Sequence, residues 1–355
     1  MISPAFDEEQ AIVFGVDNKY LKYLYVLIKS IVDTSIDTEK YDIVIFHTCT
    51  DSTRMNDISN LQKENISIRF VDVWDTIKDH DLYISRHLSI ATYYRIFIPQ
   101  ILTKYRKAIY LDTDVIVLDN INNLFNMELN GHWLGVMPNM TSPTVHGYRR
   151  YLDKKNFYRH KYFNTGVLVL DLDKLREINF TQLCLDKAVE LGDTNEGHDN
   201  DLICMLCYQH VQRLDLNWHC PANMIDPTTA NHEFFSRYIP FLFGDEVEDF
   251  WTNPKLIHYV GPGPYKPWNN RNSSLLMLTD KWWDVAKTTP YYEEFCKELE
   301  EYIWPDGIIN YIHPEKFYTN KSANEKLKER RQESPFLEYR KKRCKVYLKE
   351  LINNF

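Results

Sequence analysis

The chain has 355 residues, enough to bury a large core, and its 44% hydrophobic and 26% charged residues are typical of a globular protein. The formal net charge of −8 argues against a nucleic-acid-binding protein. No apolar run is long enough to span a membrane, and the N-terminal residues lack the basic and apolar regions of a signal peptide, so we expect neither a transmembrane helix nor secretion.

The first part of the chain alternates between strand and helix patterns. Apolar runs predict strands at 11–17, 41–46 and 66–73, apolar residues at helical spacing predict a helix at 20–35, and 54–64 is compatible with a helix. Strand, helix, strand, helix, strand is the start of a doubly wound α/β sheet of the nucleotide-binding type. The glycine-rich fingerprint of a dinucleotide site is absent from this sequence.

The next segment, 85–102, has an apolar face at helical spacing and predicts a helix that contains Arg95. Pro99 is expected to mark the end of this helix, because proline breaks a helix interior. An apolar run then predicts a buried strand that begins at Lys107.

Two acids, Asp112 and Asp114, stand between two apolar and partly β-branched runs. Burying both would cost several kcal/mol unless they left the core or met a cation. We therefore expect the strand to end at Leu111, so that both carboxylates emerge at the carboxyl edge of the sheet, where open α/β sheets bind their ligands. Two acids this close can bind one hard divalent ion, Mg²⁺ or Mn²⁺. The alternative is a solvated turn between two strands.

The remainder of the chain continues the α/β pattern with longer irregular segments. A polar and aromatic stretch at 139–160 and an insertion at 232–254 are expected to cover the site or bind an acceptor. A loop rich in Gly and Pro at 261–268 holds Lys266, which can face an anion. The other predicted elements are a short helix at 119–125, strands at 133–137, 162–171 and 256–260, and helices at 180–191, from Asp199 onward, and at 282–299.

The seven cysteines are an odd number and show no disulfide framework, which favours a reduced, cytoplasmic protein. Cys204 and Cys207 have zinc-like spacing, but no second pair follows and their neighbours are apolar, so a buried helix face is expected. Asp199 and Asp201 fit the first turn of the same helix, where acids complement the helix dipole.

Four landmarks occur in order along the chain. They are Tyr94-Arg95, Tyr110-Leu-Asp-Thr-Asp114, Phe163-Asn-Thr-Gly166, and Asp199-Asn-Asp201 ahead of His258 and Lys266-Pro-Trp268. With these motifs, residues 10–285 resemble glycosyltransferase family 8, whose retaining enzymes include bacterial lipopolysaccharide galactosyl- and glucosyltransferases and related bacterial glycoprotein glycosyltransferases. The combination is far more specific than any single motif.

The resemblance implies an α/β protein with the GT-A fold, a single doubly wound nucleotide-diphospho-sugar transferase domain with a mixed central sheet. This domain would span 1–285, with a nucleotide-binding half at 10–118 and an acceptor half at 119–285. A helical, basic and amphipathic extension would follow at 286–355.

The resemblance also implies roles for individual residues. Asp112, Asp114 and His258 would be the ligands of Mn²⁺, with Mg²⁺ as the other option. Lys266 would neutralise the leaving diphosphate, and Arg95 would bind sugar hydroxyls or phosphate unless it forms a structural ion pair. Asp17 and Asn18 would contact the uridine, and Asn164 and Asp199 would hold the donor sugar. The full implied set for a UDP-sugar is Val16, Asp17, Asn18, Arg95, Asp112, Thr113, Asp114, Asn164, Asp199, Asn200, Gly261, Gly263 and Lys266.

Retention of configuration requires either a covalent carboxylate intermediate or front-face attack by the acceptor. The family usually has Gln beneath the anomeric carbon, and this chain has the shorter Asn200. An amide is a poor nucleophile, which favours front-face transfer, although Asp199 and Asp201 remain candidates for a nucleophile. A second departure is the spacing of four residues between Gly261 and Lys266, so either the loop is longer or Gly263 takes the role of the family's glycine.

Two other hypotheses compete with a metal-dependent hexosyltransferase. In a haloacid-dehalogenase-like phosphatase, Asp112 would be the nucleophile, Asp114 the acid and base, and 243–249 a metal motif. The strands that precede Asp112, together with the Asn-Thr-Gly and Lys-Pro-Trp motifs, argue against it. A non-catalytic scaffold with the transferase fold is the second alternative, against which the intact Asp-x-Asp motif and His258 argue.

The C-terminal residues 321–355 hold eleven Lys and Arg against five Glu, interspersed with apolar residues. A basic amphipathic helix of this kind can lie on an anionic membrane surface, here the inner face of the cell membrane. The alternatives are a helix that pairs two subunits or one that packs on the body. The expected partners are a UDP-hexose, with glucose or galactose undecided, and a glycan or glycosylated protein as acceptor.

Overall fold

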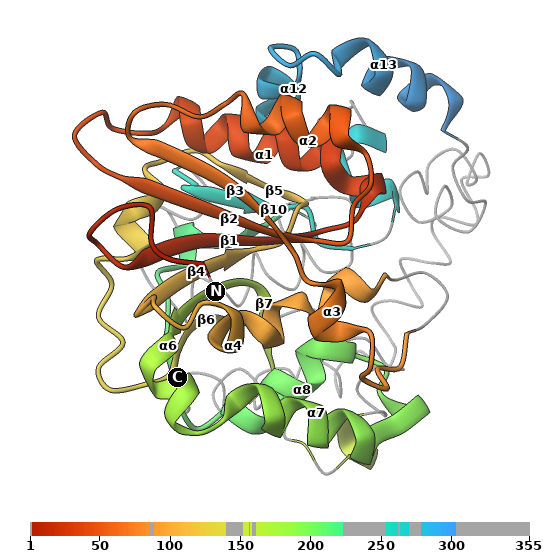
Figure 1. Cartoon of the computed structure of the whole chain (residues 1–355). Helices are drawn as coiled ribbons and strands as arrows, with labels where there is room; N and C mark the ends of the chain where they lie inside the picture. The colour runs from red at the N-terminus through yellow and green to blue at the C-terminus, as the bar shows by residue number, and fades with distance from the viewer. Residues whose placement is uncertain are drawn as a thin grey trace, which may run out of the picture.

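Figure 1 shows the computed structural model of the chain, which describes residues 2–84, 89–139, 152–155, 157, 161–222, 253–261, 263–269 and 278–302. Two sheets form its centre. The larger contains β1 (Gln10–Val16), β2 (Tyr41–His47), β3 (Ile66–Asp72), β4 (Lys107–Leu111), β6 (Leu134–Pro138), β7 (Phe163–Asp171) and β8 (Val211–Arg213). The smaller contains β5 (Val115–Val117), β9 (Cys220–Pro221) and β10 (Leu256–His258).

The larger sheet has the strand order β3-β2-β1-β4-β7-β6-β8. Strands β3, β2, β1 and β4 run parallel, as do β6 and β8, whereas β7 runs antiparallel to both β4 and β6. The smaller sheet has the order β5-β10-β9. Because β5 follows β4 after a short turn, the two sheets meet at the carboxyl end of β4.

Helices cover both faces of the larger sheet (Figure 1). On one face lie α1 (Leu21–Asp33), α2 (Ser52–Ser59), α12 (Thr279–Ala286) and α13 (Tyr292–Glu301). On the other lie α3 (Trp74–Ile77), α4 (Ile98–Ile101), α6 (Leu172–Glu177), α7 (Phe180–Leu191) and α8 (His198–Cys207). Short 3₁₀ helices include η1 (Asn18–Tyr20), η2 (Ile90–Phe97), η3 (Ile121–Leu124), η8 (Gly263–Tyr265) and η9 (Pro267–Asn269).

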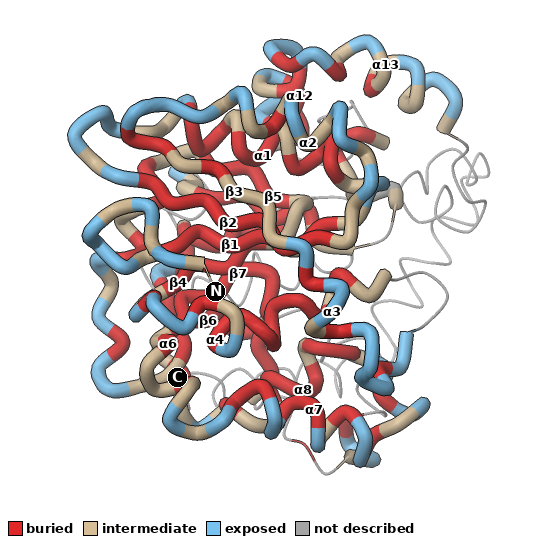
Figure 2. The backbone as a smooth tube through the Cα atoms, viewed as in Figure 1, coloured by how far each residue is buried: buried red, intermediate tan, exposed pale blue. Residues whose placement is uncertain are grey.

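Strand β1 shows how the sequence builds two cores. Ile12 and Phe14 pack with the buried side of α1, while Ala11 and Val13 pack with η2 and α4 on the opposite face. Successive side chains of a strand point to opposite faces, so a run that is apolar at every position is buried on both. Figure 2 shows these strands buried between two helical layers whose outer surfaces are exposed.

The predicted strands are found close to their predicted positions, and the prediction of α7 is confirmed at both ends. The predicted helix at 85–102 is wrong in type, because its described part is the 3₁₀ helix η2 followed by one turn of α-helix. Pro99 lies in the first turn of α4 instead of at the end of a helix, where its missing N–H costs no hydrogen bond. The 119–125 helix is the 3₁₀ helix η3.

Three predicted boundaries also differ from the structure. The helix predicted at 54–64 ends at Ser59, and the strand predicted at 256–260 ends at His258. The helix predicted at 282–299 is two helices, α12 and α13, separated by residues 287–291. Pro290 lies in this break, because proline cannot continue a helix.

Several predictions fall wholly or largely outside the described residues. They are most of the loop at 139–160, the insertion at 232–254 and the basic tail at 321–355. Cys204 and Cys207 lie buried on α8, as predicted, and all six cysteines in the described ranges are free thiols. Among the helices that the structure describes, none combines the length and the apolarity needed to cross a membrane.

Candidate active site

The Asp-x-Asp turn joins the two sheets. Strand β4 ends at Leu111, as predicted, and β5 begins at Val115. Two backbone hydrogen bonds hold the turn between them: Asp112 N–H donates to the Gly166 carbonyl at 2.8 Å, and Tyr259 N–H donates to the Asp114 carbonyl at 2.9 Å. The acids therefore project from a backbone that both sheets hold in place.

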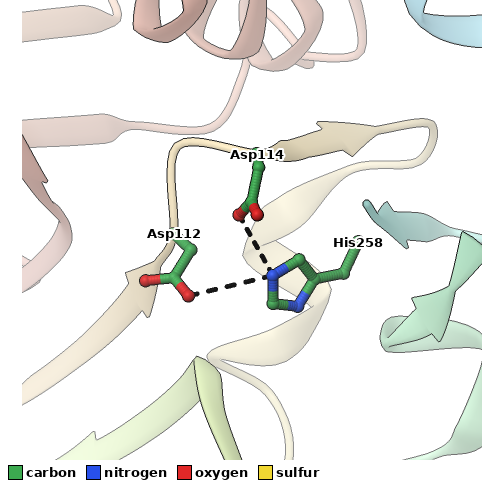
Figure 3. A group of neighbouring side chains, drawn as sticks. All are labelled: Asp112, Asp114 and His258. Atoms are coloured by element: carbon green, nitrogen blue, oxygen red, sulfur yellow. Dashed lines mark ion pairs between the residues drawn. The ribbon is translucent and has the colours of Figure 1, made fainter. Parts of the chain in front are cut away.

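His258 faces this turn from the end of β10. It pairs with Val115 in the antiparallel β5–β10 ladder, and its side chain is buried. The Nε2 atom lies 3.0 Å from Asp114 Oδ1 and 3.8 Å from Asp112 Oδ2, and Figure 3 shows both carboxylates pointing at this nitrogen. One ligand atom from each residue lies within 4.8 Å of the others. Two carboxylates and one imidazole are a donor set that fits Mn²⁺ or Mg²⁺.

Gly166 on β7 makes room for this cluster. A β-carbon at this position would overlap His258 Cε1 and would lie 2.5 Å from Asp112 Oδ2. The Gly166 N–H donates to Asn164 Oδ1 at 2.7 Å, which holds the Asn164 side chain against the backbone of β7 beside the acidic pair. The space that a side chain would fill here lies against two of the three predicted metal ligands.

Lys266 brings a positive charge to the same cluster. Its Nζ forms an ion pair with Asp114 Oδ2 and donates a hydrogen bond to the Tyr259 carbonyl at 2.8 Å. Burial opposes ionisation of Asp114, but the charge of Lys266 and the hydrogen bonds from His258 and Lys266 outweigh it and hold the pKa of this carboxyl far below its usual range.

The loop that carries Lys266 is anchored by its neighbours. The Pro267 carbonyl accepts a hydrogen bond from Trp283 Nε1 at 2.9 Å, and the Trp268 ring stacks on Tyr23 with ring centres 4.0 Å apart. Gly261 has a φ of +115°, a conformation that favours glycine, at the point where the chain turns from β10 into this loop. Packing on α1 and α12 thus positions Lys266.

Arg95 of η2 joins the predicted metal ligands to the predicted sugar-binding residues. Its Nη2 lies 2.7 Å from Asp112 Oδ1, its Nε lies 2.9 Å from Asp199 Oδ2, and its Nη1 donates to the Thr165 carbonyl at 2.6 Å. Its guanidinium lies over the Tyr110 ring at 4.3 Å. Burial opposes the charge, but Asp112 and Asp199 raise the pKa of Arg95, which stays a cation. Of the two roles expected for Arg95, a sugar or phosphate contact and a structural ion pair, the structure shows ion pairs with Asp112 and Asp199.

The first turn of α8 supplies three polar residues with different surroundings. Asp199 is buried, accepts a hydrogen bond from Thr92 Oγ1 at 2.6 Å, and has its pKa raised by burial against the opposing charge of Arg95. Asp201 is fully buried and accepts from the Tyr162 hydroxyl at 2.7 Å and from Gly197 N–H at 2.8 Å. These contacts anchor the start of α8 and favour a structural role for Asp201.

Asn200 is hydrogen-bonded to residues at the start of β7. Its Nδ2 donates to the Phe163 carbonyl at 2.9 Å, and its Oδ1 accepts from Thr165 N–H at 3.2 Å and from Thr165 Oγ1 at 3.1 Å. Both ends of the amide are thus bound to the strand that also carries Asn164 and Gly166.

The residues predicted to contact uridine lie at the end of β1. Asp17 caps η1 by accepting from Tyr20 N–H at 3.2 Å, and Asn18 Oδ1 accepts from the backbone N–H groups of Thr50 at 2.9 Å and Asp51 at 3.1 Å. Val16 is buried. Burial raises the pKa of Tyr20, and the negative charges of Asp114, Asp17 and Asp112 raise this pKa further.

One residue that contacts the cluster directly has no local sequence pattern that identifies it. His219, just before β9, places its Nε2 2.7 Å from His258 Nδ1. Strand β9 lies beside β10 in the smaller sheet, and this pairing brings together two histidines that are distant in the sequence. Tyr20, whose pKa is raised by burial and by the acids of the site, is a second residue that no local sequence pattern identifies.

The structure thus brings most of the predicted residues to one place. Asp112 and Asp114 both face His258, Lys266 pairs with Asp114, and Arg95 connects Asp112 to Asp199. Thr113 lies within the turn, while Val16, Asp17 and Asn18 lie at the end of the strand that neighbours β4.

Residues 11–272 match the family model described as Glycosyl transferase family 8. The chain belongs to glycosyltransferase family 8. It is 28% identical over 295 residues to the glycosyltransferase GlyB of Streptococcus pneumoniae serotype 4, covering 77% of this chain and 61% of that protein. It is 24% identical over 272 residues to general stress protein A of Bacillus subtilis, covering 74% of this chain and 89% of that one. The match therefore spans less than two thirds of GlyB but most of the second relative.

Two solved structures share the fold. The bifunctional glycosyltransferase WbbM superposes with a TM-score of 0.69 at 23% identity, over 83% of this chain and 52% of that one. The galactosyltransferase LgtC, solved with donor and acceptor sugar analogues, gives a TM-score of 0.63 at 24% identity, over 85% of this family 8 chain and 99% of that one. These matches confirm the expected GT-A fold with its mixed central sheet. Membership in the family sets aside the phosphatase hypothesis, whose proposed motif at 243–249 lies outside the described residues.

Proposed function

We propose that this protein is a metal-dependent, retaining glycosyltransferase that moves a hexose, glucose or galactose, from a UDP-sugar to a hydroxyl of a glycan acceptor. The observation that carries the proposal is the convergence of Asp112, Asp114 and His258, with Lys266 against Asp114, at the carboxyl edge of the sheet. Within family 8, this cluster supports an active enzyme over a non-catalytic scaffold. A scaffold would not need to hold the carboxylates and the Lys266 ammonium together at the carboxyl edge of the sheet.

Asp112, Asp114 and His258 would hold the cation, Mn²⁺ or Mg²⁺. When bound, the cation would stabilise the negative charge that develops on the diphosphate as the bond to the sugar breaks. The buried surroundings would strengthen this attraction, since charges interact more strongly where water is excluded.

Lys266 supplies the second positive charge. Its ammonium is already close to the carboxylates and is carried by a loop packed on Tyr23 and Trp283. In the proposed reaction, Lys266 donates hydrogen bonds to the leaving diphosphate, so that no acid is needed to protonate it. Val16, Asp17 and Asn18 would contact the uridine at the end of β1.

The polar residues of β7 and α8 support front-face transfer. Asn200 has its amide bound to the backbone of β7, and Asp199 is ion-paired with Arg95, so neither is a strong nucleophile as it stands. In the proposed step, the acceptor hydroxyl attacks from the face that the diphosphate leaves, and its proton passes to the leaving phosphate oxygen. Asn164 and Asp199 would hold the donor sugar, with Gly261 and Gly263 shaping the loop beside the diphosphate.

The proposed acceptor is a lipo-oligosaccharide or glycoprotein glycan, for which we expect the 139–160 and 232–254 segments to form the binding site. LgtC, which shares the fold, is described with donor and acceptor sugar analogues bound. We further propose a cytoplasmic enzyme whose 321–355 tail contacts the inner face of the membrane or pairs two subunits.

A donor screen tests the proposed function. UDP release would be measured from a panel of UDP-sugars with Mn²⁺, with Mg²⁺ and with EDTA, for the wild type, Asp114→Asn and Asp42→Asn. Asp42 is a more deeply buried acid that is ion-paired with Arg69 outside the site, so it controls for loss of a buried charge. We expect UDP release from one UDP-hexose, abolished by EDTA, reduced at least about 100-fold by Asp114→Asn and retained in Asp42→Asn.

Absence of UDP release from every donor by the folded, metal-loaded wild type would support the scaffold instead. Release that is unaffected by EDTA would contradict the metal dependence.

A further inference from the structure

His219 and His258 form a buried pair of imidazoles beside the acidic cluster. Strand β9 begins at Cys220, immediately after His219, and pairs in parallel with β10, which ends at His258. The two rings approach through His219 Nε2 and His258 Nδ1, which lie 2.7 Å apart, and each side chain is 2–3% exposed. The contact uses the nitrogen of His258 that faces away from Asp112 and Asp114.

A contact of this length between two neutral imidazoles needs one donor and one acceptor. When His258 Nε2 carries the proton, it donates to Asp114 Oδ1 at 3.0 Å, and His258 Nδ1 must accept from His219. When Nε2 offers its lone pair to a cation, the proton of His258 lies on Nδ1 and His219 Nε2 must accept it. The same pair of atoms thus has two proton arrangements, and the second is the one in which His258 can act as a ligand.

The other nitrogen of His219 leaves both arrangements accessible. Its Nδ1 is buried and has no hydrogen-bond partner within the part of the chain that the structure describes. A carbonyl or a hydroxyl at this point would fix the proton of His219 on one nitrogen. Without such a group, His219 can donate or accept through Nε2, according to what His258 requires.

We propose that His219 is a positioning residue for the metal site. It holds the His258 ring with Nε2 toward Asp112 and Asp114, and its Nε2 accepts a hydrogen bond from the His258 Nδ1–H when a divalent cation binds. This inference rests on the proposed metal dependence, and it assigns to His219 a role in cation affinity without any contact to the sugar.

The test is Mn²⁺ affinity in the presence of UDP, measured by isothermal titration calorimetry on the wild type, His219→Gln and His219→Leu. Glutamine places an amide oxygen near the position of Nε2 and can accept from His258, whereas leucine has similar bulk and no acceptor. We expect Mn²⁺ binding to weaken about 10- to 100-fold in His219→Leu and to be largely restored in His219→Gln. Thermal unfolding of the metal-free variants checks that both are folded.

Two results would overturn the inference. One is an affinity for Mn²⁺ in His219→Leu equal to that of the wild type, and the other is an equal loss in His219→Gln and His219→Leu. Failure of the proposed function looks different, because the wild type itself would then bind Mn²⁺ no better than Asp114→Asn.

A second measurement does not depend on the variants folding. Nitrogen-15 NMR of histidine-labelled wild type, with and without diamagnetic Mg²⁺, distinguishes a proton on Nδ1 from one on Nε2. We expect Mg²⁺ to move the proton of His258 to Nδ1 and that of His219 to Nδ1 as well. If the His219 signals are unchanged by Mg²⁺, the proposal that His219 changes from donor to acceptor when the cation binds is contradicted.

Discussion

The absence of a side chain at Gly166 leaves space for His258 and Asp112. A β-carbon there would overlap the His258 ring and crowd Asp112, two groups that the backbone holds in fixed positions. Packed interiors give way little to an added methyl group, so the strain would fall on the side chains around the cluster.

We predict that Gly166→Ala lowers Mn²⁺ affinity at least about 10-fold, because both ligands must move to admit the methyl group. Calorimetric titration of Mn²⁺ in the presence of UDP measures this loss. Gly131→Ala is the matched control, because Gly131 has a φ of +87° and open space around it. That change should cost about 1 kcal/mol of unfolding free energy and leave Mn²⁺ affinity unchanged. Equal Mn²⁺ affinity in Gly166→Ala and the wild type would contradict the steric argument.

At the residue scale, the sequence predicts the position of Asp112 and Asp114 at a strand end, but it does not predict all the residues that contact their cluster. Asp112 and Asp114 could be placed at a strand end because two charges inside a buried run are too costly. The ion pairs of Arg95 and the contact of His219 join segments far apart in the sequence, and a lone charged residue or histidine carries no local pattern that names its partner. The contact of His219 with His258 could be predicted only if the pairing of β9 with β10 were known.

At the scale of elements, sequence patterns predicted strands better than helix types. The mainly apolar runs of β1, β2 and β4 are long enough to identify buried strands. An apolar face repeats in a similar way in 3₁₀ and α-helices, which explains why η2 was predicted as α-helix. Pro99 was misplaced because proline is compatible with the first turn of a helix as well as with its end.

The element α13 is fastened to α1 by a buried cation. Lys22 is 5% exposed and forms ion pairs with Glu294 and Glu298, and Glu294 also lies 2.8 Å from Arg54. Burial opposes ionisation of Glu294, but Lys22 and Arg54 lower its pKa, so the carboxylate is charged at neutral pH. Tyr23, beside Lys22, stacks on Trp268 in the Lys266 loop.

We predict that Lys22→Met lowers the unfolding free energy by about 1–2 kcal/mol, because it leaves the partly buried Glu298 without its cation and Glu294 with Arg54 alone. Urea unfolding measures the change, and hydrogen exchange of α13 locates it. Lys287→Met removes an exposed lysine that pairs with Asp284, and this control should change the unfolding free energy by less than about 0.5 kcal/mol. Equal effects of the two substitutions would show that burial of Lys22 contributes nothing.

At the scale of the whole molecule, buried tyrosines connect stability to alkaline pH. Burial raises the pKa of Tyr41 to about 12 and that of Tyr94 to about 12. An unfolded tyrosine has a pKa of about 10, so above pH 10 the unfolded chain loses these protons first. Their stabilisation is therefore complete below about pH 10 and is lost as the pH rises toward about 12.

We predict that the unfolding free energy falls between about pH 10 and pH 12, by at most about 1.4 kcal/mol per pH unit for each such tyrosine. Urea unfolding at a series of pH values gives this slope. Tyr94→Phe removes one titrating group together with its 2.9 Å hydrogen bond to Thr48, and it should make the slope shallower although the variant is less stable at neutral pH. An unchanged slope would show that Tyr94 ionises equally in both states.

The ion pair between Lys266 and Asp114 joins residues that are 152 positions apart in the chain. During synthesis, the two acids are made long before His258 and Lys266. Closing so long a loop is slow, because its entropic cost comes before any contact repays it. We therefore expect this cluster to form late in folding, and we expect a nascent chain that stops short of β10 to present Asp114 without Lys266, while Asp112 can already pair with Arg95.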